Sequence, residues 1–315
     1  MQCKYTFLLP AYKAKFLRNA LESIKGQTFH DFRVIVSNDC SPESLKEIYD
    51  ETCGNDARFT YRCNEHNIGG NSLVAHWNLL VDICDTEFLI MASDDDRYDK
   101  HFLEEIDKLS LKYPEVDLFH VRVREIDAEG NTVRKDAVYE ERVNQLEFIS
   151  QYEYFNHIEC VANNVFRTKI LKQNGGFYDF PLAWASDTAT SFVMAKNGVV
   201  NTRNLLFDFR MSGLNISSFE KEKKEIMRKK FDAMLMYNKC VNKILDSISV
   251  KNEYESHLLK TIVQYHKRHV MSAACYYSVA LPFHEFLAFV RKFHKMHFFD
   301  NKYQIYQLFR KRWTL

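Results

Sequence analysis

Three consecutive carboxylates, Asp94, Asp95 and Asp96, follow directly after the short apolar run Phe88–Met91. Such a run is typical of a buried strand, and in an open α/β sheet ligands lie beyond the carboxyl ends of the strands. Adjacent acids concentrate negative charge, which is costly unless a cation shares the site. Their oxygens suit Mg²⁺ or Mn²⁺, which commonly link protein carboxylates to phosphates. The alternative is a solvated acidic turn that caps the next helix.

Polar or ring-bearing residues also follow three other predicted strands. These strands lead to Pro10 and Tyr12, to Asp39, and to Asn67. Four loops at one sheet edge can converge on one ligand. An Asp can accept a hydrogen bond from a base N–H and a Tyr can stack on its ring, so the set describes a pocket for a nucleoside diphosphate. The alternative is that these residues only form turns or pack.

The elements that must position these residues alternate along the first half of the chain. Apolar periodicity predicts strands over residues 4–9, 32–37, 59–63 and 88–91, with helices near 17–24, 41–52, 73–81 and 102–109. This order predicts a parallel sheet with helices on both faces. Further along, we predict strands over 118–125 and 164–167, helices over 143–152 and 187–197, and two closing strands over 199–202 and 205–210.

Composition indicates an ordinary globular protein. The chain has 315 residues, 46% of them hydrophobic and 27% charged, with a net charge of +1. This gives no overall attraction to nucleic acid, and no nucleic-acid partner is expected. Neither a Walker loop nor a G-x-G-x-x-G segment is present, which argues against a phosphate-loop ATPase and a dinucleotide enzyme. Eight cysteines without close pairs, and no signal-like or membrane-spanning run, lead us to expect a cytoplasmic protein with reduced thiols.

The chain resembles family 2 glycosyltransferases over roughly residues 4–217. The segments that carry the resemblance are Leu9–Tyr12, Val36–Ser41, Asn67–Gly69 with Ala75–Asn78, Asp94–Asp96, and, more loosely, Asn164–Arg167, Gly175–Phe177 and Ser186-Asp187. No single segment is specific, but their order over this span is. The chain departs from the family pattern at Asn38 and Cys40, which replace an acid and a glycine, and at Ser186, which replaces the acid before Asp187.

The resemblance implies the fold, and a change in the sequence pattern from about Ser217 implies the domain organisation. The resemblance implies an α/β protein with the GT-A fold, a Rossmann-like nucleotide-binding mixed sheet with helices on both faces, over residues 1–215. A mainly α-helical basic C-terminal extension is expected over residues 216–315.

The resemblance also implies the role of individual residues. Asp96 with Asp94 would hold Mn²⁺ or Mg²⁺, and Asp187 would be the general base of an inverting transfer. The remaining nucleotide contacts would come from Pro10, Tyr12, Asp39, Asn67, Asp94 and Asp95. Acceptor contacts are assigned to Trp184, Tyr178 and Arg210, with packing of the aromatic loop as the alternative.

The expected reaction is sugar transfer from a nucleotide-sugar donor, most often a UDP-sugar in this family, to a hydroxyl of a glycan or lipid-linked acceptor in cell-surface polysaccharide synthesis. A catalytically degenerate donor-binding partner subunit is the first alternative. A sugar-phosphate nucleotidyltransferase is a second, which lacks support because no glycine- and arginine-rich phosphate loop follows the first strand.

The tail is strongly basic. From Glu220 onward it carries 19 Lys and Arg against 9 Asp and Glu, a net charge of +10, whereas the rest carries 24 against 33. The segment Phe286–Phe299 mixes apolar and basic residues, as amphipathic helices on anionic membranes do. A peripheral contact with the inner membrane face is therefore one expectation. We favour a different expectation, in which the tail forms a helical cap on the catalytic domain or a homodimer contact.

Overall fold

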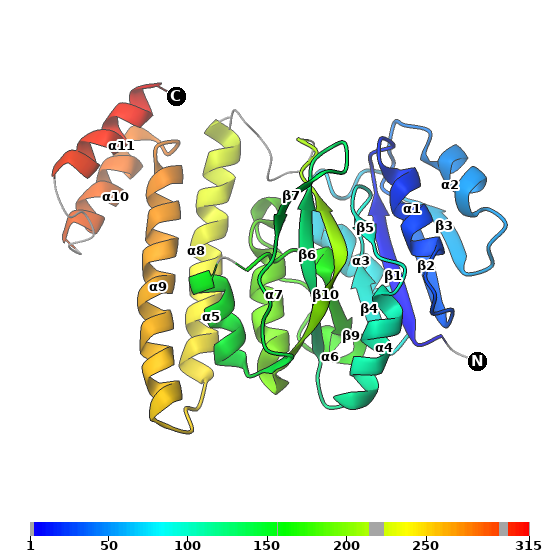
Figure 1. Ribbon diagram of the computed structural model, residues 1–315. Coiled ribbons are helices and arrows are strands. Elements are labelled where there is room, and N and C mark those ends of the chain that lie inside the picture. Colours follow the sequence, from blue (N-terminus) through cyan, green and yellow to red (C-terminus); the bar gives the residue numbers. More distant parts are fainter. Residues whose placement is uncertain (1–2, 156, 214–223, 296–301, 315) are drawn as a thin grey trace. The chain divides into compact units, whose positions relative to one another are not determined.

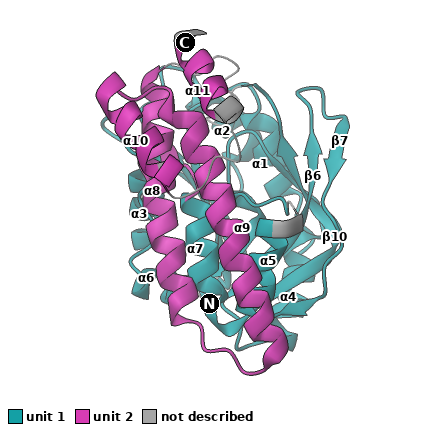
Figure 2. Ribbon diagram, turned by 90° about the vertical axis from the view of Figure 1, so that its left-hand side faces the viewer, with its two compact units in different colours: residues 1–179, 186–218 teal, residues 180–185, 219–315 magenta. Residues whose placement is uncertain are grey.

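The computed structural model describes residues 3–155, 157–213, 224–295 and 302–314. The chain divides into two compact units, which Figure 2 colours separately. Unit 1 comprises residues 1–179 and 186–218, and unit 2 comprises residues 180–185 and 219–315. The predicted boundary between residues 215 and 216 lies outside the described residues. Residues 180–185 belong with the C-terminal helices, which the sequence did not indicate.

Unit 1 is built on one mixed sheet of ten described strands (Figure 1). Its order is β3-β2-β1-β4-β9-β6-β10-β5, with β7 beside β6 and β8 beside β10. The strands are β1 (Tyr5–Ala11), β2 (Phe32–Asn38), β3 (Phe59–Cys63), β4 (Phe88–Met91), β5 (Arg97–Tyr98), β6 (Leu118–Ile126), β7 (Thr132–Lys135), β8 (Arg142–Val143), β9 (Asn164–Arg167) and β10 (Val199–Arg210).

The first half of the sheet is parallel, as predicted. Strands β1, β2, β3 and β4 run in one direction, with β1 between β2 and β4. Strand β9 runs antiparallel to both β4 and β6, which makes the whole sheet mixed. Residues 199–210 form one strand, not the two that the sequence predicted. It pairs with β6 on both sides of a register shift between Asn201 and Leu205, so the polar residues between them form an irregularity within one strand.

Helices flank this sheet. In unit 1 they are α1 (Leu17–Lys25), α2 (Leu45–Cys53), α3 (Leu73–Ile83), α4 (Phe102–Lys112), α5 (Gln145–Phe155), α6 (Thr168–Gln173) and α7 (Ser186–Met194), with 3₁₀ turns at Val161–Asn163 and Ala195–Asn197. Helix α1 buries Leu17, Ala20, Leu21 and Ile24, the apolar stripe at helical spacing. Helix α3 begins at Ser72, whose hydroxyl accepts a hydrogen bond from the amide of Ala75 at 3.0 Å.

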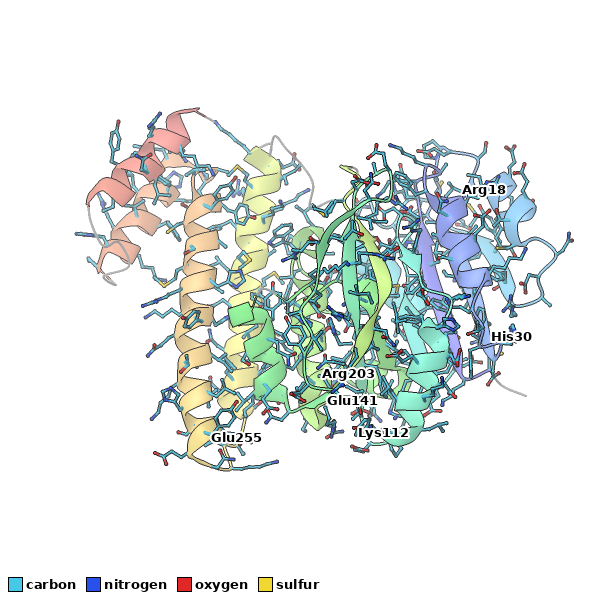
Figure 3. The ribbon with its side chains drawn as sticks, in the orientation of Figure 1. Arg18, His30, Lys112, Glu141, Arg203 and Glu255 are labelled. Carbon is cyan, nitrogen blue, oxygen red and sulfur yellow. The ribbon has the colours of Figure 1, made fainter. Side chains whose placement is uncertain are left out.

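Charged side chains pair on the outside of unit 1. Lys112, at the end of α4, forms an ion pair with Glu141, and Figure 3 labels both residues. Arg18 of α1 pairs in the same way with Glu51 of α2. Such exposed pairs contribute little to stability, so the buried apolar faces of the sheet carry most of it.

Unit 2 contains the helices α8 (Lys224–Ser247), α9 (Glu253–Ser278), α10 (Phe283–Lys295) and α11 (Lys302–Thr314), together with a 3₁₀ turn at Pro181–Ala183. Inside this unit the Phe289 ring of α10 packs against Phe231, with ring centroids 5.4 Å apart. Phe286 packs against Phe309 at 5.0 Å. The apolar face of α10 is therefore covered within unit 2, which favours a packing role for that face. Within the described residues, no helix has the length and apolar character needed to cross a membrane.

Candidate active site

The loops after the first four strands meet at the carboxyl edge of the parallel half-sheet. The amide of Asp39 donates to the carbonyl of Ala11 at 2.9 Å, and the amide of Ala92 donates to the carbonyl of Leu8 at 2.8 Å. The hydroxyl of Ser41 donates to the carbonyl of Tyr12 at 2.6 Å. Parallel pairing therefore brings the segments that the sequence singled out to one edge.

Asp39 organises the loop between β3 and α3. Its Oδ1 accepts hydrogen bonds from Asn64 Nδ2 at 2.8 Å and from the amide of Ile68 at 3.0 Å. Its Oδ2 accepts one from the amide of Gly69 at 2.6 Å. Burial alone raises the pKa of Asp39, but these donors outweigh it, so the pKa lies below its ordinary value. Asp39 is thus ionised, and most of its acceptor capacity already holds this loop.

Gly69 must be a glycine for this arrangement. A Cβ at this position would lie 2.8 Å from Oδ2 of Asp39, closer than van der Waals contact allows. The neighbouring Asn67 closes the same turn, because its Oδ1 accepts from the amide of Gly70 at 2.6 Å. The structure therefore gives Asn67 a turn-forming contact, and its contact with a nucleotide stays a prediction.

Pro10 and Tyr12 lie where β1 ends. Pro10 pairs in register with Ser37 of β2. The Tyr12 side chain is 40% exposed, so its ring is available for stacking. Both stay candidates for shaping a nucleotide pocket.

Asp94 ties the acidic loop to the segment that follows β1. Its Oδ2 accepts hydrogen bonds from the amides of Tyr12 and Lys13, each at 2.8 Å. The ammonium of Lys13 lies 3.9 Å from Oδ1 of Asp94 and 3.6 Å from Oδ2 of Asp95. Burial raises the pKa of Asp94 despite Lys13. Sequence reasoning missed Lys13, although its place beside Tyr12 in the loop after the first strand was a usable signal.

The end of β10 holds the side chain of Asp96. Its Oδ1 accepts from the amide of Arg210 at 2.8 Å, and its Oδ2 lies 2.7 Å from Oγ of Ser93. The same Oγ lies 2.7 Å from Oδ1 of Asp95. One hydroxyl hydrogen cannot serve two carboxylates at once. Burial, followed by the charge of Asp95, raises the pKa of Asp96 well above its ordinary value.

These observations fit a divalent cation at the acidic loop. Three carboxylates lie within three residues, two of them have raised pKa values because of burial, and two compete for one hydroxyl hydrogen. Excess negative charge in a desolvated site is stabilised by a cation, and carboxylate oxygens are the ligands that Mg²⁺ and Mn²⁺ prefer. Asp94, Asp95 and Asp96 are the residues that would hold it.

Arg210 is buried against the acidic loop. Its Nε donates to the carbonyl of Asp95 at 2.9 Å, and its Nη1 donates to the carbonyls of Asp127 and Ala128 at 3.2 and 3.0 Å. Its guanidinium lies 4.4 Å from the ring centroid of Phe16. The structure therefore places Arg210 where it supports the loop, and its predicted contact with the acceptor stays a prediction.

Asp187 lies in the first turn of α7. Its Oδ1 accepts from the amide of Thr188 at 2.8 Å. Burial, and next the charge of Glu159, raise the pKa of Asp187 to about 7. A general base works best when its pKa lies near the working pH, so the environment of Asp187 suits proton abstraction from a hydroxyl.

The thiol of Cys160 is influenced by the charges of both Asp96 and Asp187. Burial raises the pKa of its thiol well above the ordinary value, and the charges of Asp96 and Asp187 raise it further. One side chain therefore experiences the fields of both the acidic loop and the candidate base. The fold brings these residues near one another, although they are far apart in the sequence.

The two predicted aromatic acceptor contacts fall in different units. In unit 1, the amide of Tyr178 donates to Oγ1 of Thr190 at 3.2 Å. In unit 2, the ring of Trp184 lies 4.0 Å from Nζ of Lys230 and packs edge-on against Tyr277. Trp184 therefore has a structural role within the helical unit, which agrees with the packing alternative for this loop. Acceptor binding by either residue stays a prediction.

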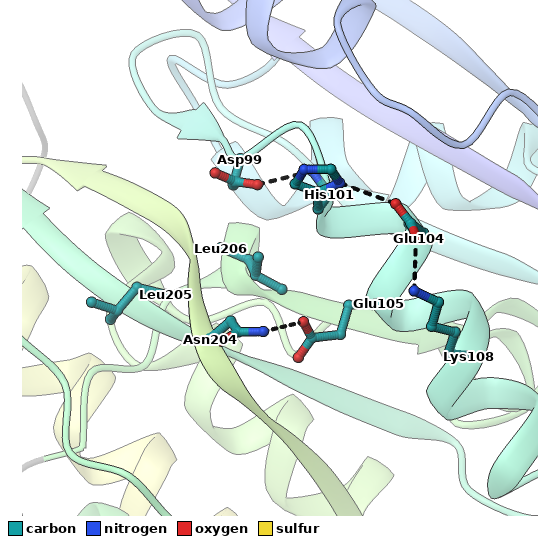
Figure 4. A pocket seen from close by; sticks show the side chains of 8 residues that line it. All are labelled: Asp99, His101, Glu104, Glu105, Lys108, Asn204, Leu205 and Leu206. Atoms are coloured by element: carbon teal, nitrogen blue, oxygen red, sulfur yellow. Dashed lines mark hydrogen bonds and ion pairs between the residues drawn. The ribbon is translucent and has the colours of Figure 1, made fainter.

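An open hollow of about 450 Å³ lies between α4 and β10 (Figure 4). None of the predicted site residues lines it; the lining residues are Asp99, His101, Glu104, Glu105, Lys108, Asn204, Leu205 and Leu206. Its charged groups pair with one another, as Glu104 does with Lys108 at 2.7 Å. We therefore locate the candidate site at the loops after β1, β2, β3 and β4, and not in this hollow.

Comparison with known proteins identifies a family and a curated relative of this chain. A family model described as Glycosyl transferase family 2 matches residues 6–175, more than half of the chain. An uncharacterised glycosyltransferase of Methanocaldococcus jannaschii is 27% identical over 160 residues, which cover 50% of this chain and 53% of that protein. The chain thus spans about half the length of this curated relative.

Two solved structures share the fold. TarS 1–349 of S. aureus in complex with UDP-GlcNAc has a TM-score of 0.64 at 17% identity, over 89% of this chain and 82% of that one. The mannosyltransferase PcManGT of Pyrobaculum calidifontis in complex with GDP-Man and Mn²⁺ has a TM-score of 0.55 at 11% identity, over 99% and 85%. The predicted GT-A fold is confirmed, and the chain belongs to glycosyl transferase family 2.

Proposed function

We propose that this chain is a metal-dependent, inverting glycosyltransferase. It transfers a sugar from a nucleotide-sugar donor, a UDP-sugar, to a hydroxyl of a glycan or lipid-linked acceptor. The observation that carries the proposal is a carboxylate with a pKa raised to about 7, Asp187, together with a buried acidic loop at a parallel sheet edge. The bound nucleotide sugars in two proteins of the same fold support the donor class.

Each part of the site has one task in this proposal. Asp187 accepts the proton of the acceptor hydroxyl while the oxygen of that hydroxyl attacks the anomeric carbon of the donor sugar. The bond between this carbon and the diphosphate oxygen then breaks. Attack opposite the leaving group inverts the configuration at that carbon. Asp39 orders the β3–α3 loop beside the nucleobase, and Lys13 adds a positive charge where the diphosphate would lie.

Asp94, Asp95 and Asp96 would hold the cation, which would supply Lewis-acid stabilisation of the charge on the leaving diphosphate. The Mn²⁺ in the PcManGT complex supports this class of cofactor, and Mg²⁺ is the other candidate. The amides of Tyr12, Lys13 and Arg210, together with Ser93, hold these three carboxylates in place.

The first test is thermal stabilisation by UDP, GDP, dTDP and CDP, each with and without Mn²⁺. A ligand at 100 times its Kd adds about 2.7 kcal/mol to the free energy of unfolding. We expect a Mn²⁺-dependent shift with UDP in the unaltered chain and none in Asp96→Ala. The matched control is Asp82→Ala, since Asp82 is an exposed acid on α3. Stabilisation by another nucleotide would replace UDP in the proposal.

Hydrolysis or transfer of the sugar is the second test. Tight nucleotide binding with no turnover of any donor would reject the enzyme and favour the degenerate partner subunit. Transfer of a nucleotidyl group to a sugar phosphate would favour the nucleotidyltransferase.

A further inference from the structure

A second group of metal-ligating side chains lies outside the acidic loop. It consists of His120 on β6 and of His157 and Glu159, which lie between α5 and β9. Within the described part of the chain, their ligand atoms all lie within 4.8 Å of one another. The side chain of His120 is 1% exposed, and those of His157 and Glu159 are 0% exposed. The roles proposed above use none of the three.

Two of the candidate ligand atoms lack hydrogen bonds. Nε2 of His157 and Oε2 of Glu159 are both buried without a hydrogen-bond partner. Leaving such atoms unpaired is costly, and native proteins rarely do so without a reason. An ion between them would satisfy both.

The two separations from Glu159 fit tetrahedral coordination. Oε2 of Glu159 lies 3.5 Å from Nε2 of His120 and 3.6 Å from Nε2 of His157. Bonds of the length found for Zn²⁺ to His and carboxylate place neighbouring ligand atoms about 3.3–3.5 Å apart in a tetrahedron. We propose that His120, His157 and Glu159 bind one divalent transition-metal ion of the Zn²⁺ class.

Residues around the group hold its ligands in the required orientation. Nδ1 of His157 faces Oδ2 of Asp136 at 3.6 Å, the carboxylate–histidine arrangement often found behind a metal-bound imidazole. Nδ2 of Asn164 donates to Oε1 of Glu159 at 2.8 Å, which leaves Oε2 directed at the group.

Two contacts at Nε2 of His120 must be released for the ion to bind. One is with the carbonyl oxygen of Ile158, at 3.3 Å. Nδ2 of Asn163 lies 2.7 Å from Nε2 of His120, where it occupies the lone pair that a metal needs. The same Nδ2 also donates to the carbonyls of Val121 at 2.9 Å and of Ile158 at 3.3 Å. An amide has two hydrogens, so these two carbonyls satisfy it without the histidine.

The donor atoms indicate the class of ion. The group offers two imidazole rings and one carboxylate group. Imidazole, carboxylate and a site shielded from water suit Zn²⁺ and Co²⁺ better than Mg²⁺, which prefers oxygen ligands.

The location suggests what the ion stabilises. Glu159 lies close enough to Asp187 for its charge to raise the pKa of that residue. The ion would fix the segment from His157 to Glu159, which precedes Cys160 in the sequence and influences the proposed base. Only this last consequence rests on the proposed function, because metal binding itself does not depend on it.

The test measures metal content and not activity. The full chain is produced in medium with Zn²⁺, dialysed extensively without chelator, and analysed by inductively coupled plasma mass spectrometry. We expect about one Zn²⁺ per chain, and a visible absorption band of tetrahedral geometry after replacement by Co²⁺. Glu159→Gln and His157→Asn are each expected to lower Zn²⁺ retention at least 10-fold, the usual order for loss of a ligand or its support.

Three control variants separate this site from others. Asp96→Ala removes the acidic-loop cation, Asp187→Asn removes the proposed base, and His257→Asn removes an exposed histidine of unit 2. All three should retain Zn²⁺ and the Co²⁺ band. Retention of Zn²⁺ by Glu159→Gln and His157→Asn, with loss in His257→Asn, would assign the ion to the tail and overturn the proposal.

The unaltered chain decides the question if the variants fail to fold. A chain that folds, as circular dichroism checks, yet takes up neither Zn²⁺ nor Co²⁺ would overturn the proposal. A failed activity test with normal Zn²⁺ content would instead reject the proposed function alone.

Discussion

The backbone amide of Arg210 donates a hydrogen bond of 2.8 Å to the carboxylate of Asp96, although 114 residues separate the two in the sequence. Arg210 is the last residue of β10, and its Nε also donates to the carbonyl of Asp95 at 2.9 Å. The acidic loop is therefore closed by the final strand of the sheet. A metal site at this loop would therefore depend on all of unit 1 and not on its first half alone.

The rate should depend on pH through Asp187. Its pKa is raised to about 7, because burial and then the charge of Glu159 disfavour the ionised form. A base must be deprotonated to accept a proton, so we expect kcat/KM to rise with pH and to level off above about pH 7. Asp187→Asn should lose about 10²–10⁴-fold in kcat and retain its Kd for the nucleotide. Asp82→Asn is the control, and an unchanged rate in Asp187→Asn would remove Asp187 as the base.

Asp187 should also make the protein less stable as the pH rises. Because its folded-state pKa is raised above the ordinary value of 3.8 to about 7, the folded state binds more protons than the unfolded state between these values. The free energy of unfolding therefore falls as pH rises through this window and stays low above it.

The same Asp187→Asn variant tests this stability effect. It should be more stable than the unaltered chain at pH 8, by about 1–3 kcal/mol, and equally stable near pH 4. Urea unfolding at the two pH values measures the difference. If the variant and the unaltered chain have the same free energy of unfolding at pH 8, burial does not destabilise the ionised carboxylate of Asp187.

Replacing Arg210 by Lys should weaken the acidic loop. Lysine retains the charge but cannot make the fork of hydrogen bonds to the carbonyls of Asp95, Asp127 and Ala128. We expect a loss of about 1–3 kcal/mol in the free energy of unfolding, and weaker Mn²⁺ binding by isothermal titration calorimetry. Arg203→Lys, at an exposed position of the same strand, is the matched control. Full Mn²⁺ affinity in Arg210→Lys would show that the loop forms without this support.

Lys13 should have opposite effects on the metal and on the nucleotide. Its ammonium lies 3.9 Å from Asp94 and 3.6 Å from Asp95, so it competes with a cation and attracts a diphosphate. In Lys13→Met we expect tighter binding of Mn²⁺ alone and a higher Kd for the nucleotide at saturating Mn²⁺. Lys15→Met, close by on the surface, should change neither. A parallel loss of both affinities would indicate damage to the loop instead.

The local pattern of apolar residues in the sequence determined many of the strands and helices of this protein. The apolar run before Asp94 and the helical stripe from Leu17 to Ile24 are set by burial on one or both faces, which sequence periodicity reports directly. The parallel order of the first strands then follows from the alternation of strand and helix. Asp39, Asp94 and Asp96 became candidates because they follow predicted strands, and Asp187 became one through the family resemblance; their roles stay predictions.

Tertiary structure decided what these residues contact. The contact between Lys13 and Asp94 exists only because the loop after β1 lies against the acidic loop. Trp184 packs on Lys230 within unit 2. Likewise His120 and Glu159 meet only because β6 lies beside β9 in the sheet. Periodicity reports which side of an element is buried, but it carries no information about which distant side chain lies opposite. Hydrogen-bond partners and pKa shifts depend on that second fact, and only the folded chain supplies it.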